Sequence, residues 1–231
     1  RLIADVPLGV FLSGGLDSST IAYFAQKNSL NKIKTFSIGF TDKSFDESIY
    51  AEEVAKFLKT EHYHQTFTSG DLLSLIEDVS FINDEPFADA SVIPTYLLSK
   101  FTRQRVTVAL AGDGGDELLA GYPTFQALKF AKLFRLLPRL IRAGAQKAVN
   151  YLPVSFDNFS FDFRIKRILS GYDYPFEIQN QIWLGSFAPK ENQELFSKET
   201  AGQIDFNKSF SITQKLIEEV KMEPLENRLI Y

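Results

Sequence analysis

The sequence predicts an α/β protein in which helices sandwich a parallel sheet, followed by a mostly helical region. Four short β-type segments alternate with helical patterns over residues 1–123, which is typical of a parallel sheet with right-handed crossovers. Glycine-rich turns directly follow the first and the fourth of these segments. From about residue 124 aromatic-rich helical stretches take over. We therefore expect an α/β core over residues 1–123 and a helical part over residues 124–231.

The first half of the core reads as a regular alternation of strands and helices. Val10–Leu12 is a short apolar strand, and Asp17–Lys27 has apolar residues at helical spacing. The second strand is predicted at Thr35–Phe40, where β-branched and aromatic residues alternate with small ones. A helix then opens near Asp46, because acidic residues suit the first turn of a helix. His62–Phe67 is the third strand candidate.

The second half of the core continues this pattern. One helix is predicted from Ser69 to about Phe81, and another over residues 91–104. Val106–Ala111 is an apolar run, which predicts a central strand of a parallel sheet.

The helical part contains two strong helical patterns, Ala127–Leu137 and Arg139–Tyr151, separated by Pro138. Trp183 and Phe187 lie four residues apart, which predicts that they form a core pair on one helix.

Composition excludes several kinds of function. The chain of 231 residues has no cysteine, so disulfides, thiolate metal sites and a cysteine nucleophile are excluded. Its net charge of −4 argues against a broad nucleic-acid surface. It has no apolar run near the roughly 20 residues that span a bilayer, and no signal peptide pattern. A cytoplasmic location is therefore our expectation.

The first glycine-rich turn has the features of an anion-binding loop. The sequence Gly9–Ser19 passes from an apolar strand through Ser13, Gly14 and Gly15 into a helix. Glycines let the backbone approach a ligand, while the free amides and the dipole of a helix N-terminus favour negative charge. The loop is not a Walker A motif, because the chain contains no Gly-Lys pair. The alternative is an ordinary strand-to-helix turn.

The second turn places Asp113, Asp116 and Glu117 within five residues. Their mutual repulsion favours a nearby cation, and Mg²⁺ prefers one or two carboxylates together with phosphate oxygens. Because both turns follow strands of one predicted sheet, we expect them to form one site, with Asp17 and Asp116 each giving a carboxylate to Mg²⁺. Read alone, the second turn could equally be a solvated acidic loop.

His62 and His64 share a face of the third predicted strand. A zinc ion could use such a pair, but no cysteine and no third ligand lie near in the sequence. We therefore expect a structural or polar surface role for both.

These motifs resemble those of a known family. The stretch Ser13–Ser19 resembles the Ser-Gly-Gly-x-Asp-Ser signature of the ATP pyrophosphatase (PP-loop) superfamily. Together with Gly112–Tyr122 it resembles the synthetase domain of glutamine-dependent asparagine synthetases. Three further segments agree with that family in order: the lead-in Asp5–Leu12, the strand Phe36–Phe40 with Phe45–Glu47, and the acceptor-side loop at residues 84–95.

The resemblance implies a role for each matching residue. The residues that would bind ATP are Phe11, Leu12, Ser13, Gly14, Gly15, Leu16, Asp17, Ser18, Ser19, Ile38, Ala111 and Gly112. Asp17 and Asp116 would bind Mg²⁺. Asp113 stands where many members have a glutamate that helps to deprotonate the attacking ammonia, so it would be the general base, one methylene shorter.

The implied reaction is the adenylation of the side-chain carboxylate of aspartate, followed by attack of ammonia. The family's glutaminase domain has a cysteine nucleophile, so the cysteine-free chain lacks that domain. A later catalytic lysine of the family is also expected outside the chain, and we expect the chain alone to make little or no asparagine. The implied partners are small molecules, without nucleic acid or membrane, and we allow for a homodimer.

Two alternatives stay open at this point. The same adenylation could serve another acceptor, as in β-lactam synthetases or in amidotransferases that act on sugar acids. The chain could also be a non-catalytic nucleotide-binding module.

Overall fold

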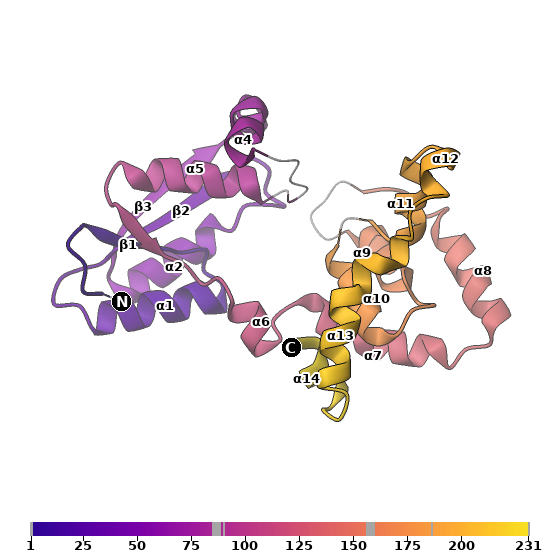
Figure 1. Cartoon of the computed structure of the whole chain (residues 1–231). Helices are drawn as coiled ribbons and strands as arrows, with labels where there is room; N and C mark the ends of the chain where they lie inside the picture. Colours follow the sequence, from indigo (N-terminus) through magenta and orange to yellow (C-terminus); the bar gives the residue numbers. More distant parts are fainter. Residues whose placement is uncertain (1, 85–88, 90, 156–159, 186, 231) are drawn as a thin grey trace. The chain divides into compact units, whose positions relative to one another are not determined.

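The chain forms two compact units, Arg1–Gly115 and Asp116–Tyr231. The structure is a computed structural model that describes residues 2–84, 89, 91–155, 160–185 and 187–230 (Figure 1). No helix among these residues is long and apolar enough to cross a membrane.

The first unit is built on a four-stranded parallel sheet. Its strands are β1 (Leu8–Phe11), β2 (Lys34–Phe40), β3 (Glu61–Phe67) and β4 (Val108–Leu110). Their spatial order is β3-β2-β1-β4, and every pairing is parallel. The chain thus adds β2 and β3 on one side of β1 and then returns to add β4 on the other side. The predicted α/β fold with a parallel sheet is confirmed.

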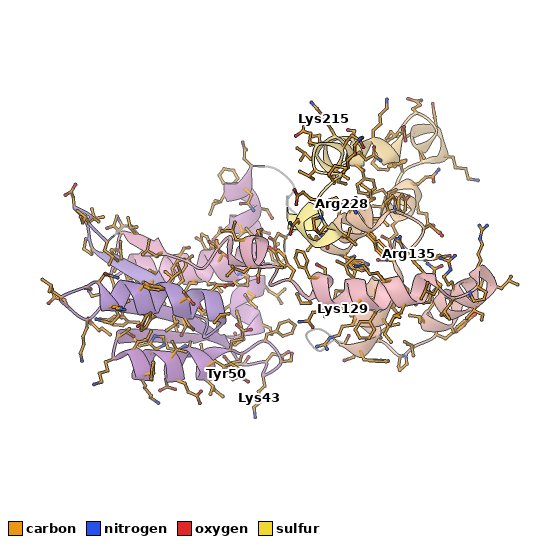
Figure 2. The ribbon with its side chains drawn as sticks, turned by 90° about the horizontal axis from the view of Figure 1, so that it is seen from below. Lys43, Tyr50, Lys129, Arg135, Lys215 and Arg228 are labelled. Carbon is orange, nitrogen blue, oxygen red and sulfur yellow. The ribbon has the colours of Figure 1, made fainter. Side chains whose placement is uncertain are left out.

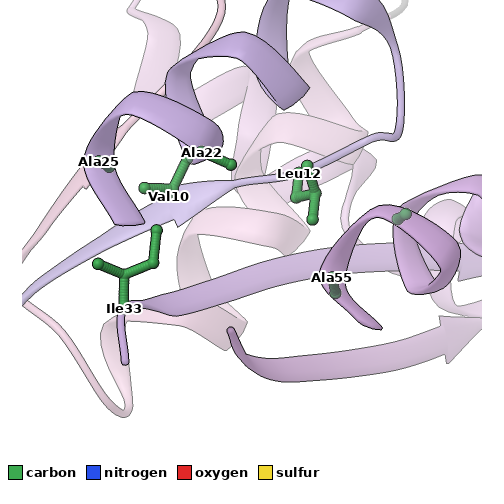
Figure 3. Packing of buried hydrophobic residues seen from close by; sticks show 7 residues of the cluster. Val10, Leu12, Ala22, Ala25, Ile33 and Ala55 are labelled. Atoms are coloured by element: carbon green, nitrogen blue, oxygen red, sulfur yellow. The ribbon is translucent and has the colours of Figure 1, made fainter. Parts of the chain in front are cut away.

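Helices cover both faces of this sheet (Figure 1). Their bounds are α1 (Leu16–Lys27), α2 (Ser48–Leu58), α3 (Ser69–Leu73), α4 (Ile76–Asn83) and α5 (Val92–Arg103). On one face, the buried side chains of Val10, Leu12 and Ile33 pack against alanines of α1 and α2 (Figure 3). On the other face, Phe36 packs against Phe101 of α5. The small alanines let the two helices approach the sheet closely, which keeps the loop after β1 beside α2.

Two element predictions were wrong. Val106–Ala111 was expected to be a central strand, but β4 covers only three residues and lies at one edge of the described sheet, with Val108 41% exposed. Its apolar character has another cause, because Val106 packs beneath α5 with Phe36. The helix predicted from Ser69 to Phe81 is divided into α3 and α4. The Ser74 hydroxyl donates to the Asp71 carbonyl at this break, so it competes with helix continuation.

All the secondary-structure elements in the described residues of the second unit are helices. Its elements are α6 (Gly115–Leu119), α7 (Pro123–Arg135), α8 (Arg139–Val149), α9 (Phe161–Leu169), α10 (Phe176–Leu184), α11 (Pro189–Leu195), α12 (Lys198–Ala201), η1 (Phe206–Phe210), α13 (Ser211–Glu219) and α14 (Leu225–Ile230). The first of these begins with Gly115, the last residue of the first unit. The central helix is α10, which buries Ile178, Ile182 and Trp183. Trp183 contacts Leu128 and Ala131 of α7.

This second core also contains polar side chains. Gln179 is fully buried, and its Oε1 accepts a hydrogen bond from Nη2 of Arg135 at 2.8 Å. The guanidinium of Arg135, labelled in Figure 2, lies 3.7 Å from the centre of the Phe176 ring. Arg167 donates through Nε to the Trp183 carbonyl at 2.8 Å. Arginines that donate to buried acceptors therefore hold α7, α9 and α10 together.

The predicted pair of Trp183 and Phe187 was wrong. Trp183 is 4% exposed, whereas Phe187 lies beyond the end of α10 and is 51% exposed. The helix ends at Leu184, so the spacing of four residues does not place the two side chains on one face of a helix.

Candidate active site

The site lies where the order of the strands reverses. β1 and β4 are neighbours, with Val10 aligned to Leu110, but α1 and β2 follow β1 whereas β4 arrives after β3 and α5. In open parallel sheets ligands bind at the carboxyl ends of the strands where such a reversal occurs. Both glycine-rich loops leave the sheet at this position, one after Phe11 and one after Leu110.

The first loop is held by a small hydrogen-bond network of two serines. The Oγ atoms of Ser13 and Ser18 lie 2.9 Å apart, and the Ser13 amide donates to Ser18 Oγ at 3.2 Å. The Gly15 amide donates to Ser13 Oγ at 3.2 Å. These bonds tie the loop to the first turn of α1, so that the loop has a defined shape before any ligand binds.

Gly14 has a backbone conformation that only glycine adopts easily. Its φ is +85°, and a Cβ there would lie 2.5 Å from the backbone carbon of Tyr50 and 2.7 Å from the Ala51 amide. The loop therefore packs directly on the first turn of α2, where Tyr50 is labelled in Figure 2. The sequence analysis missed this contact, since nothing in the pattern of residues 48–51 indicates it.

The second loop lies against Asp17. A Cβ on Gly115 would lie 2.4 Å from Cγ of Asp17, and a Cβ on Gly112 would lie 2.8 Å from the Ser18 amide. These contacts leave no room for a side chain at either glycine. The structure therefore brings Asp17 to the backbone of the loop at residues 112–115, across two neighbouring strands.

The start of α1 has donors that a ligand could use. The helix begins after Gly15, which caps it without a side-chain hydrogen bond, so its first amides lack such a cap. Ser19 Oγ is shielded from solvent and has no hydrogen-bond partner among the described residues. An unpartnered hydroxyl, uncapped amides and glycine-lined backbone fit a phosphate chain of a nucleotide.

The other predicted nucleotide residues occupy different positions around this loop. Phe11 and Ile38 are half-buried and contact the cluster of Phe36 beneath α5. The side chain of Leu12 points into the core on the opposite face, so only its backbone is available to a ligand. Leu16 is 79% exposed, and Ala111 is half-buried at the start of the second loop.

An acidic turn opens the second unit. Asp116 directly follows Gly115, and its backbone carbonyl accepts a hydrogen bond from the Gly121 amide at 3.0 Å. The Tyr122 hydroxyl donates to Glu117, which raises the pKa of Tyr122 to about 12 and lowers the pKa of Glu117. Tyr122 was not singled out in the sequence. Its position five residues after Glu117, beyond the end of a short helix, gave no periodic signal.

Asp113 and the described part of the acceptor-side loop are the remaining predicted site residues. Asp113 is exposed near the tip of the second loop, one residue before Gly114, whose φ is also +85°. In the acceptor-side loop, residues 85–88 and 90 lie outside the described residues. Asp89 accepts a hydrogen bond from the Ser91 amide at 2.8 Å.

The carboxylates of the candidate site suit a hard metal ion that is coordinated partly by the protein and partly by the phosphates of a bound nucleotide. Among the described residues, no group of three or more His, Asp or Glu side chains could hold a metal alone. Mg²⁺ typically takes one or two carboxylates and completes its shell with phosphate oxygens and water. Asp17, which faces the second loop, and Asp116, the residue that follows this loop, are carboxylates of the required type.

Comparison with known proteins agrees with this geometry. Residues 1–209 match the family model described as "Asparagine synthase". The chain is 45% identical over 158 residues to a putative glutamine-hydrolysing asparagine synthetase of Methanocaldococcus jannaschii, covering 68% of the chain and 30% of that relative. It is 38% identical over 135 residues to a Bacillus subtilis asparagine synthetase, covering 58% of the chain and 21% of that relative. The chain thus spans less than a third of the curated relatives it matches.

Proposed function

Because the chain belongs to the asparagine synthase family, we propose that it is the ATP-dependent synthetase part of a glutamine-hydrolysing asparagine synthetase. It adenylates the side-chain carboxylate of aspartate and releases pyrophosphate. Ammonia then converts the adenylate into asparagine and AMP. The cytoplasm is the proposed location.

One observation supports this proposal above the others. The Asp17 carboxylate lies against Gly115, and Cβ of Asp17 and the Ser18 amide lie against Gly112, at the place where the strand order reverses. A nucleotide-binding module without catalysis needs the amides of the first loop but has no need for a carboxylate pressed against a second loop. The proposed reaction does need one, because a carboxylate there would hold the Mg²⁺ that offsets the negative charge on the departing pyrophosphate.

Each part of the site has a task in the first step. A carboxylate oxygen of aspartate attacks the α-phosphorus of ATP, and the bond from this phosphorus to the bridging oxygen breaks. The amides of Gly14 and Gly15 and the hydroxyls of Ser18 and Ser19 donate to the oxygens of the leaving pyrophosphate. Asp17 and Asp116 would hold Mg²⁺, which when bound neutralises part of this charge.

The second step requires ammonia and a base. The nitrogen attacks the acyl carbon, AMP leaves, and one proton must be removed from the nitrogen. Asp113 is the proposed base, because it is exposed near the tip of the second loop. A glutaminase domain outside this chain is the proposed source of ammonia, as the relatives' names include glutamine hydrolysis.

The experiment measures release of pyrophosphate by the full-length protein with ATP and aspartate. Asp17→Asn should lower the rate at least about 100-fold, the effect of removing one preorganised electrostatic contact in other enzymes. The matched control is Asp78→Asn, since Asp78 is also an acid in the first turn of a helix but lies on α4. This control should leave the rate unchanged.

Three results would contradict the proposal. Turnover that is independent of Asp17 removes this residue from the mechanism. Pyrophosphate release with a sugar acid or another carboxylate in preference to aspartate assigns a different acceptor. Nucleotide binding without any turnover of a carboxylate indicates a non-catalytic module.

A further inference from the structure

A continuous file of six polar side chains crosses β2 and β3 on the face covered by α2. Its members, in order along the file, are Thr60, Thr35, His62, Ser37, His64 and Thr66. The links measure 2.8 Å from Thr60 to Thr35, 2.9 Å from Thr35 to His62 and 3.1 Å from His62 to Ser37. The last two measure 3.0 Å from Ser37 to His64 and 3.1 Å from His64 to Thr66.

The strand register produces this file. Thr35 is aligned with His62, and Ser37 with His64, so that the side chains of each pair project from the same face. Thr35 is fully buried and Ser37 is 4% exposed, whereas His62 is half-buried and His64 is open to solvent. Solvent can therefore exchange protons with the file at His64.

His64, the fifth member of the file, lies near Asp46, the residue that anchors α2. A Cβ on Gly39 would lie 2.7 Å from Oδ1 of Asp46 and 2.8 Å from Cε1 of His64, so both side chains occupy the space above this glycine. Oδ1 of Asp46 also accepts a hydrogen bond from the amide of Ser48, the first residue of α2, at 3.1 Å.

The first turn of α2 is the part of that helix that touches the nucleotide loop. Tyr50 and Ala51 lie so close to Gly14 that no side chain fits there. A displacement of Asp46 would move this turn and, with it, the loop. Asp46 and the first turn of α2 therefore lie between His64 and Gly14.

The hydrogen bonds of the file and the closeness of its two imidazole rings determine how many added protons the rings can carry. With both imidazoles neutral, all links are satisfied, because each ring donates from one nitrogen and accepts at the other. One added proton can also be accommodated, since Ser37 then accepts from the charged ring and donates to the neutral one. Two added protons would make Ser37 accept from both rings through its two lone pairs, and the two positively charged rings that share this hydroxyl would repel each other. The pair therefore takes up one proton readily and resists a second.

The charged groups around the two rings differ. Burial lowers the pKa of His62, nearby His64 lowers it further, and Glu52 of α2 opposes both effects. Lys32, Lys56 and Lys59 line the hollow next to His62, and Lys56 pairs with Glu52 at 3.1 Å. His64 instead faces Asp46. Burial raises the pKa of Asp46, but the hydrogen bonds from Ser48 and Phe40 and the charge of His64 outweigh it and lower the pKa overall.

We propose that Ser37, His62 and His64 are positioning residues for the nucleotide loop, and that a single proton on the histidine pair tightens the binding of MgATP. The proton on His64 strengthens its contact with Asp46, which fixes the first turn of α2 against Gly14. This inference rests on the proposed function of the loop, and by linkage MgATP must in turn favour the protonated pair.

The binding test compares two variants of His64 in the full-length protein. An asparagine keeps an amide near the position of Nδ1 but cannot titrate, whereas a leucine removes the link to Ser37. By calorimetry with MgATP, we expect wild-type affinity to rise about fivefold more between pH 8 and pH 6 than that of His64→Asn. His64→Leu should lack the same part of the pH dependence and should bind about tenfold more weakly than wild type at pH 6. Because ATP itself titrates in this range, only differences between variants are used.

Two binding results would overturn the inference. One is a His64→Asn protein with the full pH dependence of wild type, and the other is a His64→Leu protein with wild-type affinity at pH 6. If His64→Leu does not fold, Ser37→Ala breaks the file at its centre with a smaller change and must show the same weakening.

A second measurement does not depend on nucleotide. Histidine-labelled protein observed by NMR should show the two rings sharing one titration step, with the second step well separated at lower pH, and MgATP should move the first step to higher pH. Independent titration of the rings overturns the inference even if MgATP binds. Failure of wild-type protein to bind MgATP instead contradicts the proposed function, so the two failures are distinguishable.

Discussion

The two units bury their interiors in different ways. In the first unit, the sheet buries aliphatic and aromatic side chains against alanines of α1 and α2 and against Phe101 of α5. In the second unit, α10 buries Gln179 and Asn180 along with Ile178; Arg135 donates to Gln179, and Arg167 donates to a backbone carbonyl. The first interior depends on close apolar packing, whereas the second also buries polar side chains, some of them hydrogen-bonded and others, such as Oδ1 of Asn180, without a partner among the described residues.

The glycines of the candidate site differ from Gly144 of α8 in the space around them. A Cβ on Gly14 or Gly112 would lie within 3 Å of helix backbone, and a Cβ on Gly115 would meet the side chain of Asp17. Gly144 of α8 has no atom within 4 Å of the position that a Cβ would take. Steric exclusion thus shapes the candidate site in the first unit, whereas the position of a Cβ on Gly144 of α8 is open.

The largest expected effect tests this steric exclusion. Gly115→Ala places a methyl group 2.4 Å from Cγ of Asp17, so that the carboxylate or the second loop must move. Displacements of about 1 Å in an active site can cost 100-fold in rate. We expect a loss of pyrophosphate release of about that size in full-length protein. Turnover at the wild-type rate would show that the contact between the two loops is not needed.

The next effect concerns the apolar interior. Phe36 is fully buried, stacks on Tyr63 and meets the edge of Phe101. Phe36→Ala should lower the free energy of unfolding by about 3–5 kcal/mol, measured by urea denaturation. Phe36→Leu keeps most of the volume and should cost clearly less. Equal losses for both variants would mean that the volume kept by leucine contributes nothing and that the aromatic ring itself is required.

The polar interior should respond to a change that keeps volume. Gln179→Met removes the acceptor for Arg135 and the donor to the carbonyls of Ile168 and Ser170. Leaving such groups unpaired should cost about 1–3 kcal/mol in unfolding free energy. Gln181→Met, at an exposed position of the same helix, is the control and should be nearly neutral. A neutral Gln179→Met would contradict the description of this interior as polar.

A pH experiment distinguishes the units by their response to acid. The Ser160 hydroxyl donates to Asp162 at 2.7 Å and, with Lys166, outweighs the effect of burial and lowers the pKa of Asp162 to about 2. Its contribution to stability is therefore fully present above pH about 4 and is lost as the pH falls towards about 2. The single tryptophan, Trp183, reports on the second unit by fluorescence.

Asp162→Asn should remove this part of the acid dependence. The control Asp78→Asn lies in the first unit and should leave the fluorescence transition unchanged. An unaltered acid transition in Asp162→Asn would assign the dependence to other carboxylates.

The smallest effect is a stabilisation. Gly144→Ala fills open space within a helix and should raise the free energy of unfolding by about 0.5–1 kcal/mol without changing turnover. Because the same substitution at Gly115 is expected to lower pyrophosphate release about 100-fold, the pair of variants directly compares a constrained glycine with an unconstrained one. A destabilised Gly144→Ala protein would indicate a contact at this face of α8.

The comparison explains which parts of the fold were predictable from the sequence. The strands and helices of the first unit follow local patterns, such as the alternation of Thr35–Phe40 and the small residues at Ser13–Gly15. The contact of Gly14 with α2 and the edge position of β4 depend on how distant elements pack, so no local pattern carries them. In the second unit, Gln179 and Arg135 look like surface residues in the sequence, and only the tertiary structure pairs them.

The candidate site shows the same division. Its residue types and the approach of its two loops followed from their position after strands of one parallel sheet. Asp116, Asp113 and the metal stay predictions, as does the exact role of each nucleotide residue. The turn that joins Glu117 to Tyr122 had no periodic signal, because it forms beyond the end of a helix of only five residues.

The reversal of strand order has a consequence for how the protein is made. Asp17 and Gly112 meet across β1 and β4, yet 95 residues separate them in the chain. At about 5–20 residues per second, a ribosome needs roughly 5 to 20 s to synthesise that interval. During this time β1, β2 and β3 can already pair, but the carboxylate of Asp17 has no second loop beside it. The site is thus among the last parts of the first unit to form, and a nascent chain cannot assemble it before the whole unit has been synthesised.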